Sequence, residues 1–309
     1  MTQYGLLVST EEWRTMLSEA QQAETLGFHS IWVDDHLLPF NHKNPENRLE
    51  AWTSLTALAT STLKIRLGNL VLCNSFRNPA LVGKMIASLD NISSGRLEVG
   101  LGAGWFEEEY KAFGYDFHKP GSRIKQLQES LDILELVFSG QKFDYTGSNW
   151  TLEDCQSLPR PIQSPMPIWI GGTGSKMVHL AVDKASGLNI TSSAPEEFEK
   201  IMNRVTETCD ELGKKKSNFK TSYMTFVHFT KDMEEREKVI DYLHETWYPQ
   251  PPREAFETLL VGPIELVKEK ASYYLENYDL NLFIGKVKGT ESIDNPIALF
   301  HDEILNSFT

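Results

Sequence analysis

The chain has 309 residues, of which 40% are hydrophobic and 24% charged, a balance typical of a soluble globular protein with a continuous core. Its formal net charge of −13 argues against nucleic-acid binding, because a polyanion is bound by clustered Lys and Arg side chains. No basic and apolar leader and no run of about 18 apolar residues is present, so we expect a cytoplasmic protein with no membrane partner.

Strand-length apolar runs alternate with amphipathic helical patterns along the whole chain. An early helical pattern with apolar residues from Trp13 to Ala23 ends at Gly27. A later one ends at Gly140, and another helix is predicted near 263–277, starting at Pro263. The predicted strands lie near residues 3–9, 29–34, 66–73, 96–102, 167–171, 187–192, 221–229 and 281–286.

Eight strand–helix units in a chain of this length predict an α/β fold, a (β/α)₈ TIM barrel that spans residues 1–309 as a single domain. An open doubly wound sheet is the alternative. The segment 231–260 is longer than one crossover helix requires, and it leads into a proline-rich stretch, 247–252. We therefore predict an insertion before the last strand, of a kind that covers a barrel mouth or makes a subunit contact.

The fourth predicted strand ends in alternating glycines, Gly100, Gly102 and Gly104. Glycine weakens a strand, so glycines at a strand tip usually mark the close approach of a ligand or of another backbone. Their spacing matches neither a dinucleotide fingerprint nor a P-loop. The alternative interpretation is that they only relieve crowding inside the barrel.

Other strand ends also carry candidate functional groups, since barrel active sites lie at the C-terminal ends of strands. Asp35 and His36 follow the second strand, where they could transfer a proton or, alternatively, cap a helix at the surface. The segment 171–175 is rich in glycine and opens directly into a helix, and 191–193 adds hydroxyl groups. Together these two strand ends predict an anion-binding cradle, with a plain capped turn as the alternative.

Other arrangements of polar residues are weaker candidates. Glu107, Glu108 and Glu109 could be combined with Glu50 as glycosidase carboxylates. We expect them instead to supply helix N-terminal charge and a solvated face. The three cysteines suggest neither a disulfide framework nor a zinc site, and Cys73 has no neighbouring base to activate it. No metal site is predicted, since His118, His179, His228 and His301 also lack metal-ligand spacing.

Five motifs, in the expected order, resemble one known family. They closely resemble the luciferase-like flavin/deazaflavin oxidoreductase superfamily, and most of all its coenzyme F420-dependent branch, in the segments 27–36, 77–80, 89–96, 100–105 and 167–172. The resemblance covers nearly the whole chain. It implies a barrel whose mouth holds the deazaflavin edge-on, with the phosphate tail bound at strand tips, and it implies a homodimer.

The resemblance also implies roles for individual residues. Leu70 and Val71 would form a non-prolyl cis peptide that backs the ring, with Asp35, His36 and Cys73 beside it. The other cofactor contacts that it implies come from two further strand tips and a helix start: Ala103, Gly104, Gly171, Gly172, Thr173, Thr191 and Ser192.

Two departures from the sugar-phosphate dehydrogenases of this branch bear on the substrate. Trp105 stands where those relatives have an acidic residue, and Ala194 where they have a lysine near the phosphate. Sugar-phosphate oxidation is therefore not favoured. We expect a more apolar substrate pocket, lined by Trp52, Trp105, Phe106 and Glu50.

The predicted function is transfer of a hydride between coenzyme F420 and a small organic substrate, with His36 as the acid/base group and Asp35 orienting it or contacting the cofactor. The alternative enzyme is an FMN-dependent monooxygenase on the same barrel. A non-catalytic flavin-binding barrel is an alternative of another class, and a glycosidase, which would bind no flavin, is a weaker one.

Overall fold

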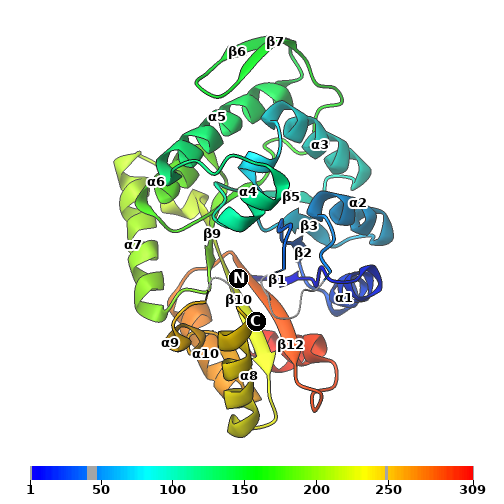
Figure 1. The fold of residues 1–309 in the computed structure, drawn as a ribbon, viewed down its shortest axis with the longest axis vertical. Helices are drawn as coiled ribbons and strands as arrows, with labels where there is room; N and C mark the ends of the chain where they lie inside the picture. Colours follow the sequence, from blue (N-terminus) through cyan, green and yellow to red (C-terminus); the bar gives the residue numbers. More distant parts are fainter. Residues whose placement is uncertain (1, 40–46, 248–249, 309) are drawn as a thin grey trace.

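The computed structural model describes residues 2–39, 47–247 and 250–308. Within them, parallel strands at eight positions close into a barrel surrounded by helices (Figure 1). The strands follow one another around the barrel as β1 (Gln3–Leu7), β2 (Ser30–Val33), β3 (Arg66–Asn69) continued by β4 (Leu72–Cys73), β5 (Leu97–Gly102), β8 (Ile168–Gly171), β9 (Gly187–Thr191), β10 (Lys220–Phe229) and β12 (Leu282–Gly289). Because β12 pairs with both β10 and β1, the sheet is closed and the predicted TIM barrel is confirmed.

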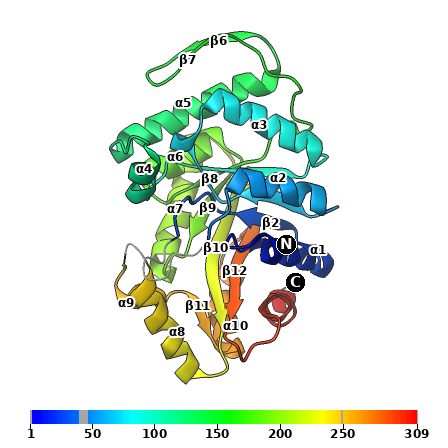
Figure 2. The same cartoon turned by 45° about the vertical axis from the view of Figure 1, so that its right-hand side comes forward.

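Helices cover the outside of this barrel, as Figures 1 and 2 show from two directions. The predicted helix ends at Gly27 and Gly140 are confirmed, and both glycines adopt the left-handed conformation that caps a helix, with φ of 86° and 73°. The helices with α geometry in the described residues are α1 (Trp13–Leu26), α2 (Ala51–Ser61), α3 (Pro79–Ile92), α4 (Glu107–Phe113), α5 (Pro120–Ser139), α6 (Ser175–Lys184), α7 (Pro195–Glu211), α8 (Met233–Thr246), α9 (Arg253–Phe256), α10 (Ile264–Asn277) and α11 (Pro296–Leu299).

Below the C-terminal ends of the strands, the barrel interior is filled by large side chains that face glycines on neighbouring strands. A Cβ atom added at Gly68 would lie 2.5 Å from the Trp32 ring, and one at Gly187 would lie 2.6 Å from the Trp169 ring. Both tryptophans belong to an interior cluster with Met224, Leu282 and Ile284. The barrel is therefore packed solid at this level, and space for a ligand is left at the C-terminal ends of the strands.

The glycines of β5 face the break between β3 and β4. A Cβ atom at Gly100 would lie against the carbonyl oxygen of Asn69, and one at Gly102 would lie 2.6 Å from the Val71 side chain. The Leu70–Val71 peptide bond is cis, as the family resemblance implied. The glycines predicted the close approach of a ligand or of another backbone. The structure shows the approach of another backbone, at Asn69, and of the Val71 side chain.

The segment before the last strand carries additional structure, as predicted. It contains α8 and α9, followed by β11 (Leu260–Gly262), which pairs with the end of β10 and was not predicted. Residues 248 and 249 of this segment lie outside the described residues. The hairpin of β6 (Phe143–Thr146) and β7 (Thr151–Cys155), which stands outside α5 in Figure 1, was also not predicted.

β10 and β12 are the longest strands of the barrel. They have 10 and 8 residues, against 4 to 6 for β1, β2, β5, β8 and β9. The sequence pattern ended the last strand at residue 286, but β12 continues to Gly289. Figure 2 shows both strands running on beside α8. One side of the barrel mouth is therefore raised.

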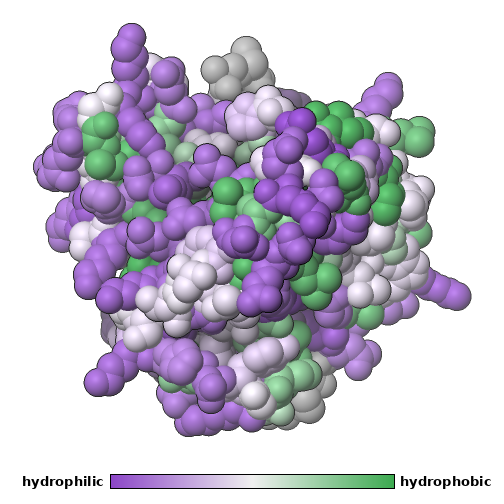
Figure 3. Space-filling view, turned by 90° about the horizontal axis from the view of Figure 1, so that it is seen from above, coloured by the Kyte–Doolittle hydropathy of each residue, from purple (hydrophilic) through white to green (hydrophobic). Residues whose placement is uncertain are grey.

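The surface agrees with the composition of the chain. The face seen in Figure 3 is mainly hydrophilic, with scattered hydrophobic side chains. Within residues 2–39, 47–247 and 250–308 no helix is both long enough and apolar enough to cross a membrane.

Candidate active site

A cavity of about 490 Å³ opens at the C-terminal ends of the barrel strands. Its volume is in the range of small-molecule and cofactor sites, and its position is that of barrel active sites. Its floor is apolar, made by Leu7, Leu70, Val71, Leu72 and Met224. No group of three or more His, Cys, Asp or Glu side chains that could hold a metal occurs in the described part of the chain.

His36 lines this cavity from the tip of β2 and is held by Glu109. The Nδ1 atom of His36 lies 3.1 Å from both carboxylate oxygens of Glu109. The Glu109 side chain is only 3% exposed, and its Oε1 atom also accepts hydrogen bonds from the backbone N–H groups of Leu37 and Leu38. This fixes the imidazole ring with Nδ1 toward the carboxylate, so exchange of a proton with a substrate would use Nε2.

Glu107, Glu108 and Glu109 were predicted to supply helix N-terminal charge and a solvated face. All three lie in the first turn of α4, but Glu109 is buried and does not belong to the solvated face. Phe106, Glu109 and Tyr110 are all buried, and their spacing of three and four residues puts them on the cavity side of α4. The same spacing was present in the sequence. This spacing was not recognised because Glu109 stands in a run of three glutamates, of which Glu107 is a surface residue paired with Lys111.

Asp35 is bound by groups other than His36. Its carboxylate receives two hydrogen bonds from the Arg77 guanidinium, at 2.7 and 2.8 Å, and one from the backbone N–H of Cys73 at 2.8 Å. Such a bidentate, charge-assisted pair is a strong anchor. Asp35 therefore ties the tip of β2 to β4 and the following turn, and the carboxylate that contacts His36 is that of Glu109. The cofactor contact that was the other role predicted for Asp35 stays a prediction.

Cys73 and Tyr110 form a second polar contact at the cavity wall. The Cys73 sulfur lies 3.1 Å from the Tyr110 hydroxyl. Burial raises the pKa of the Cys73 thiol to about 11, so it is protonated at neutral pH and is not a nucleophile. A Cβ atom on the neighbouring Gly104, whose φ is 77°, would lie against the Tyr110 hydroxyl. Ala103 and Gly104, which follow β5, thus bring the backbone to the cavity edge.

Gly171, Gly172 and Thr191 line the opposite end of the cavity, where α6 begins. The backbone N–H groups of residues 173–176 donate to no acceptor among the described residues, as expected at a helix N-terminus. Ser192 follows Thr191 and is not among the residues that line the cavity, but its hydroxyl is buried and has no hydrogen-bond partner among the described residues. These donors form a cradle for an anion. Thr173 does not line the cavity, and its carbonyl oxygen accepts a hydrogen bond from Arg204.

Two of the four predicted substrate-pocket residues line the cavity. Trp105 and Phe106 do so and stack on each other, with ring centroids 5.3 Å apart. Trp52 does not, because it packs into the hydrophobic core outside the barrel. Glu50 does not either, since its carboxylate caps α2 and pairs with Arg77.

Comparison with known proteins agrees with this geometry. The family model of luciferase-like monooxygenases matches residues 1–308. The chain belongs to this family. The resemblance that its motifs predicted is thereby confirmed.

Among individual members of the family, two curated relatives align over part of their length. An F420-dependent glucose-6-phosphate dehydrogenase of Amycolatopsis mediterranei is 29% identical over 69% of this chain and 65% of its own length. A 5,10-methylenetetrahydromethanopterin reductase of Archaeoglobus fulgidus is also 29% identical, over 68% of this chain and 59% of its own length. The chain thus spans less than two thirds of either relative. A solved F420-dependent secondary alcohol dehydrogenase, in complex with an F420–acetone adduct, shares the fold with a TM-score of 0.86 and 22% identity over 98% of both chains.

The cavity fits a flat redox ring that carries a phosphate tail. Its apolar floor, which includes Leu70 and Val71, suits the face of a tricyclic ring. The backbone N–H groups at the start of α6, which donate to no acceptor among the described residues, suit the oxygens of a phosphate. Both ends of such a cofactor therefore meet groups of the matching chemistry.

Proposed function

We propose that the chain is an oxidoreductase that transfers a hydride between coenzyme F420 and a small organic substrate. The observation that carries this proposal is the His36–Glu109 pair, which stands at one end of an apolar cavity whose other end is an anion cradle. The similar proteins support the choice of cofactor, because F420 is named in the relative from Amycolatopsis and in the similar solved structure.

When bound, the deazaflavin supplies a two-electron carrier that gives or takes a hydride at a ring carbon. The chain's own residues do the rest. The floor of Leu7, Leu70, Val71 and Met224 excludes water from one face of the site. His36 holds or removes the substrate proton at Nε2, while the buried Glu109 carboxylate accepts the Nδ1 hydrogen and keeps the ring in that orientation.

The substrate in this proposal is an alcohol or carbonyl compound with an apolar part near the reacting carbon. Trp105 and Phe106 provide the apolar wall beside His36, at ring-centroid distances of 5.7 and 6.3 Å from its imidazole. Ala194 caps α7 with its backbone carbonyl and offers no charge to a sugar phosphate. Both features are consistent with the expectation that this chain does not oxidise sugar phosphates.

Fluorescence titration of the cofactor-free protein distinguishes the proposal from its alternatives. We expect saturable quenching with F420, and binding weaker by at least about tenfold for FMN and for the same deazaflavin without its phosphate. Tight FMN binding with reduced-flavin oxygen consumption would instead support the monooxygenase. Binding of F420 without turnover of any alcohol or ketone would support a non-catalytic barrel, and binding of neither cofactor would contradict all three.

A matched pair of serine variants tests the cradle. We expect Ser192→Ala to weaken F420 binding about fivefold to tenfold, because one hydrogen bond to a charged group is lost. Ser193→Ala is the control, since the Ser193 hydroxyl already donates to the Thr191 carbonyl oxygen. Equal affinity of the two variants for F420, by the same titration, would place the phosphate elsewhere.

A further inference from the structure

Arg123 is a buried cation that the proposed mechanism does not use. It lies in the first turn of α5, is 6% exposed and lines the cavity at the barrel mouth. Its guanidinium carbon lies 4.1 Å from the centre of the Phe117 ring, and that ring packs on Tyr110 with 4.9 Å between the ring centroids. Since the Tyr110 hydroxyl contacts Cys73, Arg123 belongs to the same part of the cavity wall as the Cys73–Tyr110 contact.

The guanidinium of Arg123 has unused hydrogen-bond donors. Its Nη1 atom donates to the backbone carbonyl oxygen of His118. Its Nε atom is buried without a partner among the described residues, and Nη2 donates to none of them either. Nε and Nη2 lie along one edge of the planar guanidinium, the kind of edge that binds a carboxylate through two parallel hydrogen bonds. Nη2, unlike Nε, is not among the fully buried unpaired atoms, so a molecule in the cavity can reach this edge through Nη2.

No carboxylate of the described residues is paired with this guanidinium. None of their Asp or Glu oxygens lies within 4.0 Å of a guanidinium nitrogen of Arg123. Arg236, the other arginine that is buried in the described part of the chain, is by contrast paired with Glu237 and Glu257. A buried charge without a counter-ion is costly, and a chain with 43 acidic and 30 basic residues could readily supply one. The geometry therefore favours an anion that comes from a bound molecule.

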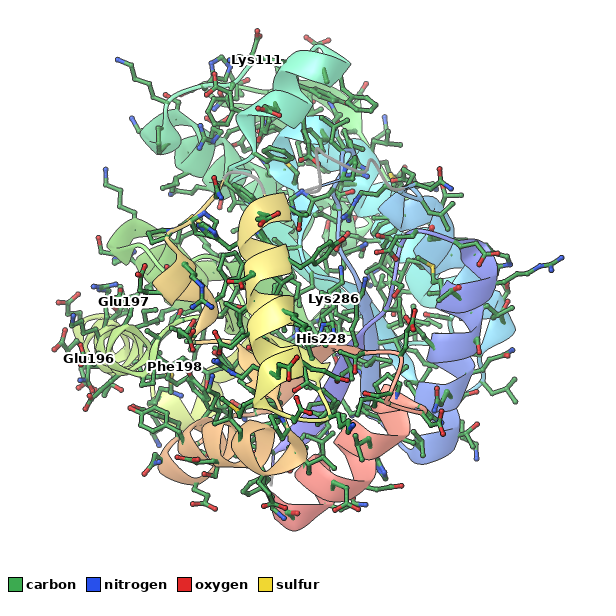
Figure 4. All side chains as sticks on the ribbon, turned by 60° about the horizontal axis from the view of Figure 1, so that its bottom comes forward. Lys111, Glu196, Glu197, Phe198, His228 and Lys286 are labelled. Atoms are coloured by element: carbon green, nitrogen blue, oxygen red, sulfur yellow. The ribbon has the colours of Figure 1, made fainter. Side chains whose placement is uncertain are left out.

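Arg123 differs in this respect from the other ionisable Asp, Glu, Lys and His side chains that line the cavity. Each of those lies within 4 Å of a partner: Lys286 with Asp34, Asp35 with Arg77, and Glu109 with His36. Lys286 is also distant from Arg123, because β12 lies opposite β5 in the order of the barrel strands. Figure 4 shows Lys286 next to His228 beside α8, apart from α4, on which Lys111 is labelled. A bound anion on the side of α4 and α5 would therefore pair with Arg123.

We propose that Arg123 binds a carboxylate group of the substrate. The carboxylate accepts hydrogen bonds along the Nη2–Nε edge, while the Phe117 ring supports the face of the guanidinium. Arg123 adjoins α4, the helix that follows the apolar wall at Trp105 and Phe106, whereas the cofactor phosphate has its own donors at the start of α6. The inference rests on the proposed function and narrows its substrate to an alcohol or carbonyl compound that is also a carboxylic acid. Binding of the carboxylate itself requires no cofactor.

Ligand-observed ¹⁹F NMR tests the carboxylate site directly. The probe is 4-(trifluoromethyl)benzoate, and the neutral 4-(trifluoromethyl)benzamide is its matched control. Both are titrated into the cofactor-free protein and into the protein saturated with F420. We expect saturable binding of the benzoate in both states, and at least about tenfold weaker binding of the amide. Displacement of the benzoate by F420 would assign Arg123 to the cofactor and overturn the inference.

A matched pair of arginine variants assigns the binding to Arg123. Arg123→Gln should weaken benzoate binding about tenfold or more, because a buried, charge-assisted contact is lost. Arg14→Gln is the control, since Arg14 is an exposed residue of α1 that does not line the cavity. Arg123→Lys keeps the charge but loses the edge with two donors, so its affinity should lie between those of the parent and of Arg123→Gln. Urea unfolding checks that each variant is folded, and Arg123→Lys carries the comparison if Arg123→Gln is not.

Failure of this inference can be told apart from failure of the proposed function. The inference is overturned if the benzoate does not bind, if the amide binds equally well, or if the Arg123 and Arg14 variants bind the benzoate alike. Benzoate binding that depends on Arg123, without any F420 binding, would contradict the proposed function and leave the carboxylate site standing. F420 binding and turnover, without benzoate binding that depends on Arg123, would do the reverse.

Discussion

The acid/base group of the candidate site is oriented by a carboxylate that lies 73 positions further along the chain. His36 follows β2, and Glu109 lies on α4, after the glycine-rich end of β5. Each residue reaches the cavity because its own strand ends there. The pair is therefore a product of the barrel, and neither residue's neighbours in the sequence indicate it.

Replacement of His36 tests the acid/base role. We expect His36→Ala to reduce turnover roughly 10²–10⁴-fold, the usual contribution of a positioned acid or base. F420 affinity should change little, because the cradle is at the other end of the cavity. The deazaflavin absorbance, followed with the best substrate from a panel of alcohols and ketones, gives the rate. An unchanged rate would reject the role.

Replacement of Glu109 tests whether it acts through His36. Glu109→Gln keeps the size of the side chain but removes the charge that faces Nδ1, and we expect turnover to fall about 10-fold to 10²-fold. Added to His36→Ala, the same change should cost little further, since groups that act as a unit are not additive. Glu107→Gln, on the exposed side of α4, is the control. Additive losses in the double variant would show an independent role.

Some residues of the site could be identified from the sequence, and others could not. His36, Gly104 and Gly172 were found because they stand at strand ends in motifs. The roles of Arg77 and Glu109 depend on contacts between distant segments, which a single sequence does not contain. Trp52 was assigned to the more apolar substrate pocket that we expected, yet its place on α2 turns it toward the outer core.

Among the elements, β5 shows how a strand's composition can be set by its neighbour. Its glycines correctly predicted a close approach, but the sequence did not tell what approaches. The structure places the carbonyl oxygen of Asn69 and the side chain of Val71 there, at the junction of β3 and β4. The glycines of β5 therefore leave room for the bulge at Leu70 and Val71, which belong to the cavity floor.

Alanine substitution measures this fit. A Cβ atom at Gly100 would meet backbone, which cannot move aside as a side chain can, so we expect Gly100→Ala to lower the free energy of unfolding by about 3 kcal/mol. Gly121→Ala is the control, because a Cβ atom at this position near the start of α5 has nothing within 4 Å. It should be neutral or stabilising by up to about 1 kcal/mol. Urea unfolding compares the two, and equal stabilities would show that the bulge does not press on β5.

The lengths of β10 and β12 were the least predictable feature of the elements. The apolar pattern of β12 stops near Lys286, so the sequence ended the strand there, although pairing with β10 continues to Gly289. Two lysines inside a strand disagree with a buried pattern unless they face a polar space. Lys286 lines the cavity at the barrel mouth, and this placement can be recognised only when the register with β10 is known.

At the scale of the whole molecule, the two ends of the barrel have different tasks. The C-terminal end holds the cavity, and the other end holds a buried network centred on Glu98. The Glu98 carboxylate accepts hydrogen bonds from Arg66 and Trp169, at 2.6 Å each, and lies 3.5 Å from His29. This network joins β3, β5 and β8 to the residue before β2, and none of its four residues lines the cavity at the C-terminal end, as expected for the stabilising end of a TIM barrel.

The Glu98 network predicts how stability depends on pH. Burial opposes the charged form, but His29, Arg66 and Trp169 outweigh it and lower the pKa of Glu98 to about 2. Since an unfolded glutamate titrates near about 4.3, the stabilisation is complete above that pH and is lost as the pH falls toward 2. We expect Glu98→Gln to cost on the order of 3 kcal/mol at pH 7 and clearly less at pH 3. Urea unfolding of this variant and of the exposed control Glu153→Gln, at both pH values, measures the difference. A loss that is equal at pH 7 and pH 3 would mean that the charge of Glu98 does not hold this end of the barrel together.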